Sequence, residues 1–427
     1  MYFCRQIESM SMRKAIVLFL LCIFAVTNLL GQESTVLKLT CAQIEALLLR
    51  QNLQLIAEKF NISIADARIA QAKLWDNPNL AISDVNLWHT SSHQEREMEF
   101  SIELSQLIQT ANKRGKLINL EKISKEMVVQ QFEEVLLGLR TELRKSIHEI
   151  SYLQSYRKAL VNQETSLNHL VEYYKKQVKQ GNISKMELLR LQSALLELTN
   201  EMNDIQTETN AQQKNLKSLL NADPLVTIEI ENENFTAKNP EELSLAFLFE
   251  QALNHRPDLQ LSRLQIKYDE KNLLYEKAMR TPDLNFSINY DRAGGVWEHF
   301  IGFGISFDLP VLNRNQGNIK AAKISLEQSR YLNHNQQNIA QHEIAEAFNN
   351  YAAQYKFYRK IESDNMLPDL DNMSDNYARS LLNKNISMLE YIDFMDTYKA
   401  NKQIILTVCK NLAVLFEELQ FSIGTTI

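Results

Sequence analysis

Tyr174–Glu187 reads YKKQVKQGNISKME, and Tyr377–Glu390 reads YARSLLNKNISMLE. The first tyrosine, the run Asn-Ile-Ser and the final glutamate occupy the same places in both stretches, 203 residues apart. The same spacing relates Phe100–Leu104, which reads FSIEL, to Phe303–Phe307, which reads FGISF. The chain is therefore a tandem duplication, and each copy is expected to form one structural unit.

A long helix and a returning helix are predicted in the first copy. Apolar residues three or four apart extend from residue 116 to about residue 180, and at 1.5 Å per residue this helix would be about 95 Å long. The turn at 181–183 breaks it. Ser184 is a candidate N-cap with Glu187 at the capping-box position, and the returning helix runs over 185–220. The product is a long antiparallel helical hairpin.

The second copy repeats this plan. A helix is predicted over 318–383, with Pro368 as a kink, and a return over 387–420. A shorter helix precedes the strands of each copy, over about 40–74 and 243–279. Only 10 Gly and 7 Pro occur in 427 residues, and this scarcity of helix breakers agrees with long helices.

Four strands are predicted in two hairpins, one hairpin in each copy. Strands 79–88 and 97–104 form the first pair, and strands 284–290 and 301–307 form the second. Apolar side chains alternate with small or charged ones, and each strand is expected to have about ten residues. A soluble sandwich has the same alternation, but hairpins set between such long helices favour strands that face lipid on one side and water on the other.

Four strands do not close a barrel, because the smallest transmembrane barrels have about eight. Unpaired strand edges are not tolerated in lipid, so two, three or four copies must associate, and a water-filled lumen disfavours two. Trp88 and Trp297 flank the two hairpin turns. They are candidates for an aromatic girdle at the membrane surface, and a place in a core is the alternative.

The N-terminus has the features of an export signal. A basic pair precedes the apolar run 15–26, and small and polar residues follow it. We expect a signal peptide at 1–31, which leaves Cys41 and Cys409 in the mature chain. Two cysteines so far apart do not form a disulfide framework. No cysteine directly follows the apolar run, so no lipid anchor is expected.

Charge and histidine content exclude several classes of function. The net charge of −6 and the pI near 5.9 argue against a nucleic-acid partner. The sequence has 8 histidines. It contains no Cys-x2-Cys ligand pair, no nucleophile elbow and no phosphate loop. The sequence therefore predicts no enzyme, no catalytic or metal site and no cofactor.

Three further motifs carry a resemblance to a known family. They are Asn254–Leu259 (NHRPDL), Leu309–Gly317 (LPVLNRNQG) and the two matching helix turns. With the duplicated plan of helix, strand hairpin and helical hairpin, they resemble the TolC-type outer-membrane efflux family over essentially the whole mature chain. Ser105–Gly115 resembles the Gly-Lys-Arg motif of the cation-efflux (CzcC/CusC-like) branch, although Asn112 replaces the glycine of that motif.

The resemblance implies a mainly α fold with β strands. Duplicated antiparallel helical hairpins would form a periplasmic α-barrel, and the two β-hairpins would contribute to a trimeric outer-membrane β-barrel of about 12 strands. It implies the exit duct of a tripartite efflux system, which passes substrates from an inner-membrane pump and a periplasmic adaptor to the exterior. Heavy-metal cations are one substrate class implied by the branch.

Two other functions remain open from the sequence. One is an outer-membrane duct for drug efflux or type I protein secretion. The other is a periplasmic coiled-coil adaptor or structural protein, which would carry one helical hairpin instead of two. The predicted division is a signal peptide at 1–31, a first repeat at 32–220, a linker with a short strand at 221–240 and a second repeat at 241–427.

The resemblance also assigns roles to the helix turns. It makes them the periplasmic tips that dock the adaptor: Gly181, Asn182, Ile183, Ser184, Lys384, Asn385, Ile386 and Ser387. Beyond the second tip, Glu390, Asp393 and Asp396 are three residues apart, which places them on one side of a helix. The family has acids at the first two of these positions, where they line the closed aperture. A solvated helix face is the competing interpretation.

Overall fold

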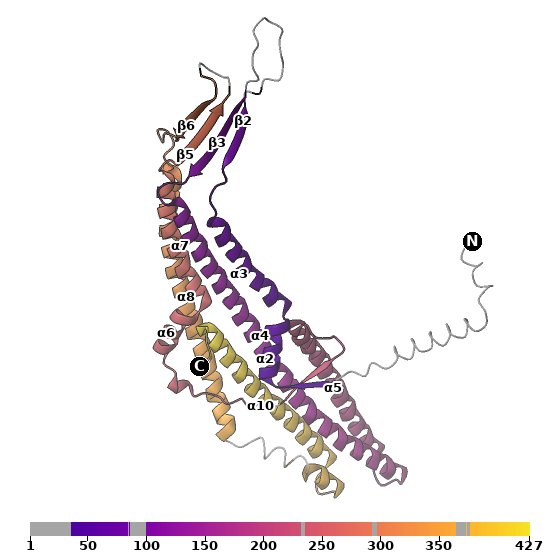
Figure 1. Cartoon of the computed structure of the whole chain (residues 1–427). Helices are drawn as coiled ribbons and strands as arrows, with labels where there is room; N and C mark the ends of the chain where they lie inside the picture. The colour runs from indigo at the N-terminus through magenta and orange to yellow at the C-terminus, as the bar shows by residue number, and fades with distance from the viewer. Residues whose placement is uncertain are drawn as a thin grey trace, which may run out of the picture. The chain divides into compact units, whose positions relative to one another are not determined.

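The computed structural model of the protein (Figure 1) describes residues 36–83, 85, 100–231, 235–292, 297–363, 373 and 376–427. The predicted signal peptide, Trp88 and Pro368 lie outside these residues. The chain divides into two compact units, and each takes segments from both sequence copies. Unit 1 comprises the described parts of Met1–Asn52, Glu142–Ala237 and Phe357–Val414, and unit 2 comprises those of Leu53–Thr141, Lys238–Lys356 and Leu415–Ile427. The predicted repeat boundaries stay a prediction.

Unit 1 is mainly helical. Its helices are α2 (Cys41–Gln51), α5 (Lys185–Leu220), the later part of α4 (Lys113–Lys179) and most of α10 (Met388–Ile423). The strands β1 (Val36–Leu39) and β4 (Thr227–Ile230) pair in parallel. The predicted long helix of the first copy and its return are thus confirmed, and Figure 1 shows them as a hairpin.

An apolar core joins the arms of unit 1. Its fully buried side chains recur at intervals of three or four residues along each helix, as expected for helices that pack along one face. They include Leu153, Tyr156 and Leu160 of α4, Leu191 and Leu198 of α5, and Tyr391 and Met395 of α10. The described helical arms therefore pack as a bundle.

Unit 2 contains a four-stranded sheet and helices. Its helices are α3 (Leu53–Ala72), the early part of α4, η1 (Pro240–Glu242), α6 (Leu245–His255), α7 (Pro257–Met279) and most of α8 (Gln316–Ser363). Its strands are β2 (Asn79–Ser83), β3 (Ser101–Ile108), β5 (Leu284–Asp291) and β6 (Phe300–Ser306). The two predicted strand hairpins therefore lie in one sheet.

The two shorter helices predicted over 40–74 and 243–279 are each broken in two. The breaks fall at Asn52 and Arg256, at matching positions of the two copies, and both residues are extended, with φ −64 and ψ 117 at Asn52 and φ −66 and ψ 119 at Arg256. Pro257 explains the second break, because a residue before proline avoids the helical region. The first break has no proline, so the sequence carries no comparable signal for it.

Each break is tied to the end of a returning helix. The Asn52 Nδ2 donates to the Leu219 carbonyl at 2.8 Å, and the Arg256 Nη1 donates to the Ser422 carbonyl at 3.0 Å. Leu219 and Ser422 lie in the last turns of α5 and α10, where carbonyls lack helical partners. The duplication thus extends to individual hydrogen bonds.

Strand β1 was not predicted. It pairs with β4, the strand expected in the linker, and Val36 is opposite Thr227. The side chain of Gln213 on α5 pairs with the backbone of Ile228 in β4. Its Nε2 donates to the Ile228 carbonyl at 2.6 Å, and its Oε1 accepts from the Ile228 N–H at 3.1 Å. A four-residue strand shows too little alternation to be recognised, and its partner is far away in the chain.

Candidate functional site

The sheet of unit 2 has the strand order β2-β3-β5-β6, and all three pairings are antiparallel. The described strands have 5 to 8 residues, shorter than the predicted length of about ten. Most of the first hairpin's predicted turn and the beginning of its second strand lie outside the described residues. Pairing of β3 with β5 joins the hairpins of the two sequence copies.

The two faces of this sheet differ in polarity. The register aligns Leu104 with Leu80 and Ile288, and Phe303 with Ile288, so apolar side chains share one face. The same face carries Ile82, Ile102, Ile108, Leu284, Phe286, Tyr290, Ile301 and Ile305, and the opposite face carries Ser83, Ser101, Glu103, Ser105, Asn285, Ser287, Asn289, Asp291 and Ser306. The exceptions are Gln106 on the apolar face and Leu107 and Phe300 on the polar face. Phe303 is 83% exposed. An apolar face exposed to this degree requires a cover.

Two glycines make room on the polar face. A Cβ atom at Gly302 would lie 2.3 Å from the Asn289 Oδ1, and one at Gly304 would lie 2.6 Å from the Ser287 Oγ. The asparagine and serine side chains therefore lie over the neighbouring strand. A side chain at either glycine would require the asparagine or serine side chain to shift.

Both outer strands have an unpaired edge among the described residues. Strand β2 pairs only with β3, and β6 pairs only with β5. An open edge presents unpaired N–H and C=O groups, which form a template for pairing with another strand. The sheet can therefore be extended at both sides.

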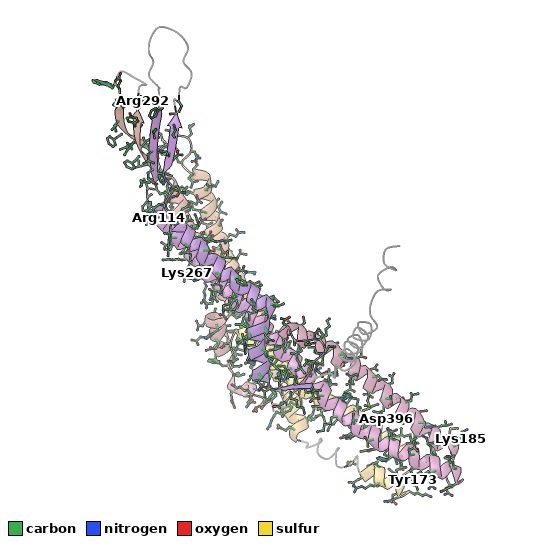
Figure 2. All side chains as sticks on the ribbon, turned by 45° about the vertical axis from the view of Figure 1, so that its right-hand side comes forward. Arg114, Tyr173, Lys185, Lys267, Arg292 and Asp396 are labelled. Carbon is green, nitrogen blue, oxygen red and sulfur yellow. The ribbon has the colours of Figure 1, made fainter. Side chains whose placement is uncertain are left out.

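One end of the sheet carries an aromatic group that the sequence analysis missed. The Tyr290 hydroxyl lies 2.6 Å from the His299 Nδ1, and the rings of Phe100 and Tyr290 are 6.0 Å apart. Arg292, labelled in Figure 2, lies over the Phe100 ring at 5.8 Å. The predicted girdle residue Trp297 is 73% exposed in the adjoining turn. Phe100 directly precedes β3, Tyr290 lies on β5 and His299 directly precedes β6. The pairings of β3 with β5 and of β5 with β6 bring these residues together.

The two predicted tips have the same backbone. Gly181 and Lys384, at matching positions, are both left-handed, with φ of 77 and 59. The Asn182 N–H donates to the Gln177 carbonyl at 3.0 Å, and the Asn385 N–H donates to the Ser380 carbonyl at 2.9 Å. This is the Schellman ending of a helix, in which glycine is the favoured residue. The second tip adopts it with a lysine, at a cost in backbone strain.

Both tips are followed by a serine N-cap, which was predicted for Ser184. The Ser184 Oγ accepts from the Met186 N–H at 3.1 Å, and the Ser387 Oγ accepts from the Glu390 N–H at 3.2 Å. At the second tip the Glu390 Oε2 also accepts from the Ser387 N–H at 2.7 Å, which completes a capping box. Figure 2 labels Lys185 at the first tip.

The capping box changes the environment of Glu390. The hydrogen bonds from the Ser387 backbone and side chain hold the pKa of Glu390 below its ordinary value. Asp393 and Asp396 are exposed on α10, while Tyr391 and Met395 between them point into the core. The three predicted aperture acids therefore lie on the solvent side of one helix, and Glu390 has a structural role as well.

Two exposed apolar residues follow the tips, and the sequence analysis overlooked them. Met186 is 62% exposed and Leu389 is 65% exposed. They are 203 residues apart, so they occupy equivalent positions of the two copies. The repeat spacing itself was the signal that could have identified this pair.

The NHRPDL motif forms a buried ion pair. The Arg256 Nε and Nη2 donate to the two carboxylate oxygens of Asp258 at 2.9 and 2.7 Å, and Nη2 also donates to Glu343 at 2.7 Å. Burial alone would raise the pKa of Asp258, but the hydrogen bonds and charge of Arg256 outweigh burial and lower that pKa. His255 beside them is exposed.

Among the described residues, no group of three or more His, Cys, Asp or Glu side chains is arranged to hold a metal ion. In the same part of the chain, every helix is too short or too polar to cross a membrane. Cys41 and Cys409 are not joined by a disulfide.

Residues 46–222 match the family model described as outer membrane efflux protein. Over this part the chain is similar to the outer membrane efflux protein family. The resemblance to TolC-type proteins is thereby confirmed, and with it the location in the outer membrane. The family consists of channel proteins of tripartite efflux systems. No curated protein matches the sequence.

Several solved structures have the same fold. The CusC channel has a TM-score of 0.72 at 16% identity, and the match covers 93% of this chain and 95% of CusC. The Campylobacter jejuni outer membrane channel CmeC has a TM-score of 0.73 at 14% identity, over 90% of this chain and 85% of CmeC. VceC of Vibrio cholerae has 0.70 at 14% identity, over 90% and 96%. The predicted fold class, mainly helical with strands, is confirmed over both copies.

Proposed function

We propose that this outer membrane efflux protein assembles as a trimer and forms the exit duct of a tripartite efflux system. The observation that carries the proposal is the four-stranded sheet, which has one exposed apolar face, one polar face and two unpaired edges. Lipid would cover the apolar face, water would fill the polar side, and edges of neighbouring copies would pair.

Three copies fit the strands best. Two copies give about eight strands, whose interior is filled by side chains, while three give about 12 and a water-filled lumen. The polar face supports such a lumen, because Glu103 and Asn289 are directly paired on it. Membrane fractionation and mild-detergent electrophoresis test this proposal. Recovery as a soluble monomer would refute it.

The tips are the proposed docking site for the periplasmic adaptor. They expose matching backbone turns, and each is followed by an exposed apolar side chain, Met186 or Leu389. Cysteines at Asn182 and Asn385 are expected to crosslink to the adaptor. A cysteine at exposed Leu225, in the segment after α5, is the control. Crosslinks from Leu225 alone would contradict tip docking.

Glu390, Asp393 and Asp396 are the proposed lining of the closed aperture. In a trimer the first two alone would bring about six carboxylates around one axis, where they attract cations. Glu390→Gln with Asp393→Asn removes these charges, and glutamine retains an oxygen for the capping box. We expect lower cation selectivity and weaker block by divalent cations in planar-bilayer recordings.

The matched control for the aperture is Glu187→Gln, because Glu187 occupies the position of Glu390 in the first copy. This variant is expected to keep the selectivity of the native channel. If the double variant also keeps it, the acids are a solvated helix face.

Heavy-metal cations are the proposed substrate class, supported by the Lys113-Arg114-Gly115 motif and by the fold likeness to CusC. A duct for drugs or secreted proteins is the alternative. Deletion of the gene should lower growth on copper, silver, zinc or cobalt salts but not on drugs. The reverse pattern would favour the alternative.

A further inference from the structure

Two groups of exposed apolar side chains flank the open edges of the sheet. Leu74 and Trp75, which lie in the connection before β2, are 61% and 60% exposed. The apolar loop, defined here as Leu309–Leu312, follows β6, and its Leu309 and Leu312 are 71% and 91% exposed. Exposed apolar groups at two edges raise the question of what covers them.

Both groups lie at the same end of the sheet. Asn79 at the start of β2 is opposite Ser105 near the end of β3, and Ser306 at the end of β6 is opposite Asn285 near the start of β5. The two edges of one copy are three strand spacings apart, about 14 Å. The apolar groups of a single copy are therefore too far apart to pack together.

The two inner connections, after β3 and before β5, are polar, and their polar groups form hydrogen bonds and an ion pair with each other. The Thr110 N–H, after β3, donates to the Asp283 Oδ1, before β5, at 2.8 Å. The Thr110 hydroxyl donates to the Pro282 carbonyl at 2.5 Å, and Lys113 forms an ion pair with Asp283 at 2.7 Å. Of the four connections, only the two at the edges carry large exposed apolar side chains. A membrane surface would meet all four connections alike, so the pattern favours a partner at the edges.

Trp75 is held in place with one side of its ring covered. The Arg114 guanidinium lies 3.6 Å from the ring centre, and its Nη1 donates to the Lys73 carbonyl at 3.2 Å. Figure 2 labels Arg114 at the helical side of the sheet, opposite Arg292. Since the residue is 60% exposed in spite of this contact, the rest of the indole is available to a partner.

Hydrogen bonds also hold the apolar loop. The Val311 N–H donates to the Leu309 carbonyl at 2.8 Å, and the Arg314 Nε donates to the Val311 carbonyl at 3.3 Å. Beyond the loop, the Asn315 Nδ2 donates to the Glu276 carbonyl of α7 at 2.9 Å. Several backbone groups of the loop are thus paired, while the side chains of Leu309, Val311 and Leu312 are exposed.

We propose that the apolar loop of one copy packs against Leu74 and Trp75 of the next copy, at the base of each seam between copies. The inference rests on the proposed edge-to-edge assembly. When β6 of one copy pairs with β2 of the next in antiparallel fashion, the end of β6 and the start of β2 come together. The loop then reaches the tryptophan, and the contact seals the seam where the strand ladder ends.

The test uses Trp75→Cys and Leu312→Cys on separate, differently tagged copies that are expressed together. Cys41 and Cys409 are replaced by serine so that only the introduced thiols react. A short bifunctional thiol reagent should join the two tags in isolated outer membranes. Either single variant expressed alone should give no covalent dimer.

A second pair of cysteines distinguishes the proposed loop contact from the edge-to-edge pairing of the strands. Leu80→Cys on β2 and Phe303→Cys on β6 report edge-to-edge pairing directly. Crosslinking of both pairs supports the contact. If only the strand pair crosslinks, the loop contact is wrong and the proposed assembly stands. If neither pair crosslinks, the proposed assembly fails as well.

Lipid, instead of a neighbouring copy, could cover Trp75, and fluorescence quenching distinguishes the two. With Trp88→Phe and Trp297→Phe, Trp75 is the sole fluorescent indole of the chain's three tryptophans. Packing against a neighbouring copy predicts little quenching of Trp75 by lipids with brominated chains. Strong quenching without the Trp75 to Leu312 crosslink would overturn the proposal in favour of a lipid anchor.

Discussion

Replacing Arg256 by alanine is expected to lower the free energy of unfolding by about 3 kcal/mol. The Arg256 side chain is 9% exposed and that of Asp258 20%, so their paired hydrogen bonds are largely shielded from water. Losing them costs about 2 kcal/mol, and leaving the buried Ser422 carbonyl unpaired costs about 1 kcal/mol more. Glu343 is 50% exposed and adds little, because water screens it.

Thermal unfolding of the detergent-purified protein, followed by circular dichroism, measures this loss. For a domain of 150–250 residues each kcal/mol corresponds to about 2–4 °C, so the midpoint should fall by about 6–12 °C. Lys267→Ala is the matched control, since Lys267 is an exposed cation on the same helix, labelled in Figure 2. Its effect should stay within about 0.5 kcal/mol.

The pH dependence of the stability difference between the native protein and Arg256→Ala tests the reasoning. The pKa of Asp258 is lowered below its ordinary value of 3.8 in the folded protein. The ion pair therefore contributes its stability above the unfolded pKa, and this contribution is lost as pH falls through the folded pKa. The difference between native protein and the Arg256→Ala variant should shrink below about pH 4. A variant no less stable than Lys267→Ala, or a difference unaffected by acid, would refute the reasoning.

Three further predictions use matched positions. Asn52→Ala removes a single neutral hydrogen bond and should cost about 1 kcal/mol, clearly less than the arginine variant, in the same melting assay. Lys384→Gly should stabilise the protein by about 0.5–1 kcal/mol, because glycine relieves the strain of the left-handed backbone. Gly181→Lys should destabilise it by a similar amount. A change of the same sign in both variants would contradict the shared backbone conformation. Tyr156→Phe should cost about 1–2 kcal/mol because it loses the hydrogen bond to Glu201, while Tyr391→Phe, whose buried hydroxyl has no partner within the described chain, should be neutral or stabilising by chemical denaturation.

Much of the candidate site could be predicted from local patterns. The tips follow from the repeated Asn-Ile-Ser run, and the cap predicted at Ser184 forms. The polarity of the two sheet faces follows from alternation in each strand. Predictions failed where the signal was short or absent, as at the Asn52 break and at β1. They were incomplete where a residue has a second role. Glu390, predicted as an aperture acid, also forms the capping box.

The sequence by itself determined the duplication, the first long helix and its return, the positions of the turns and the face of each strand, because these depend on residues that are close along the chain. Only the tertiary structure decided which segments meet. Thr110 bonds Asp283 across 173 residues, and Asn52 bonds Leu219 across 167. Such contacts depend on chain topology and side-chain reach, which periodicity does not encode. For that reason the unpaired edges, and the exposed apolar groups that flank them, could be recognised only in the folded chain.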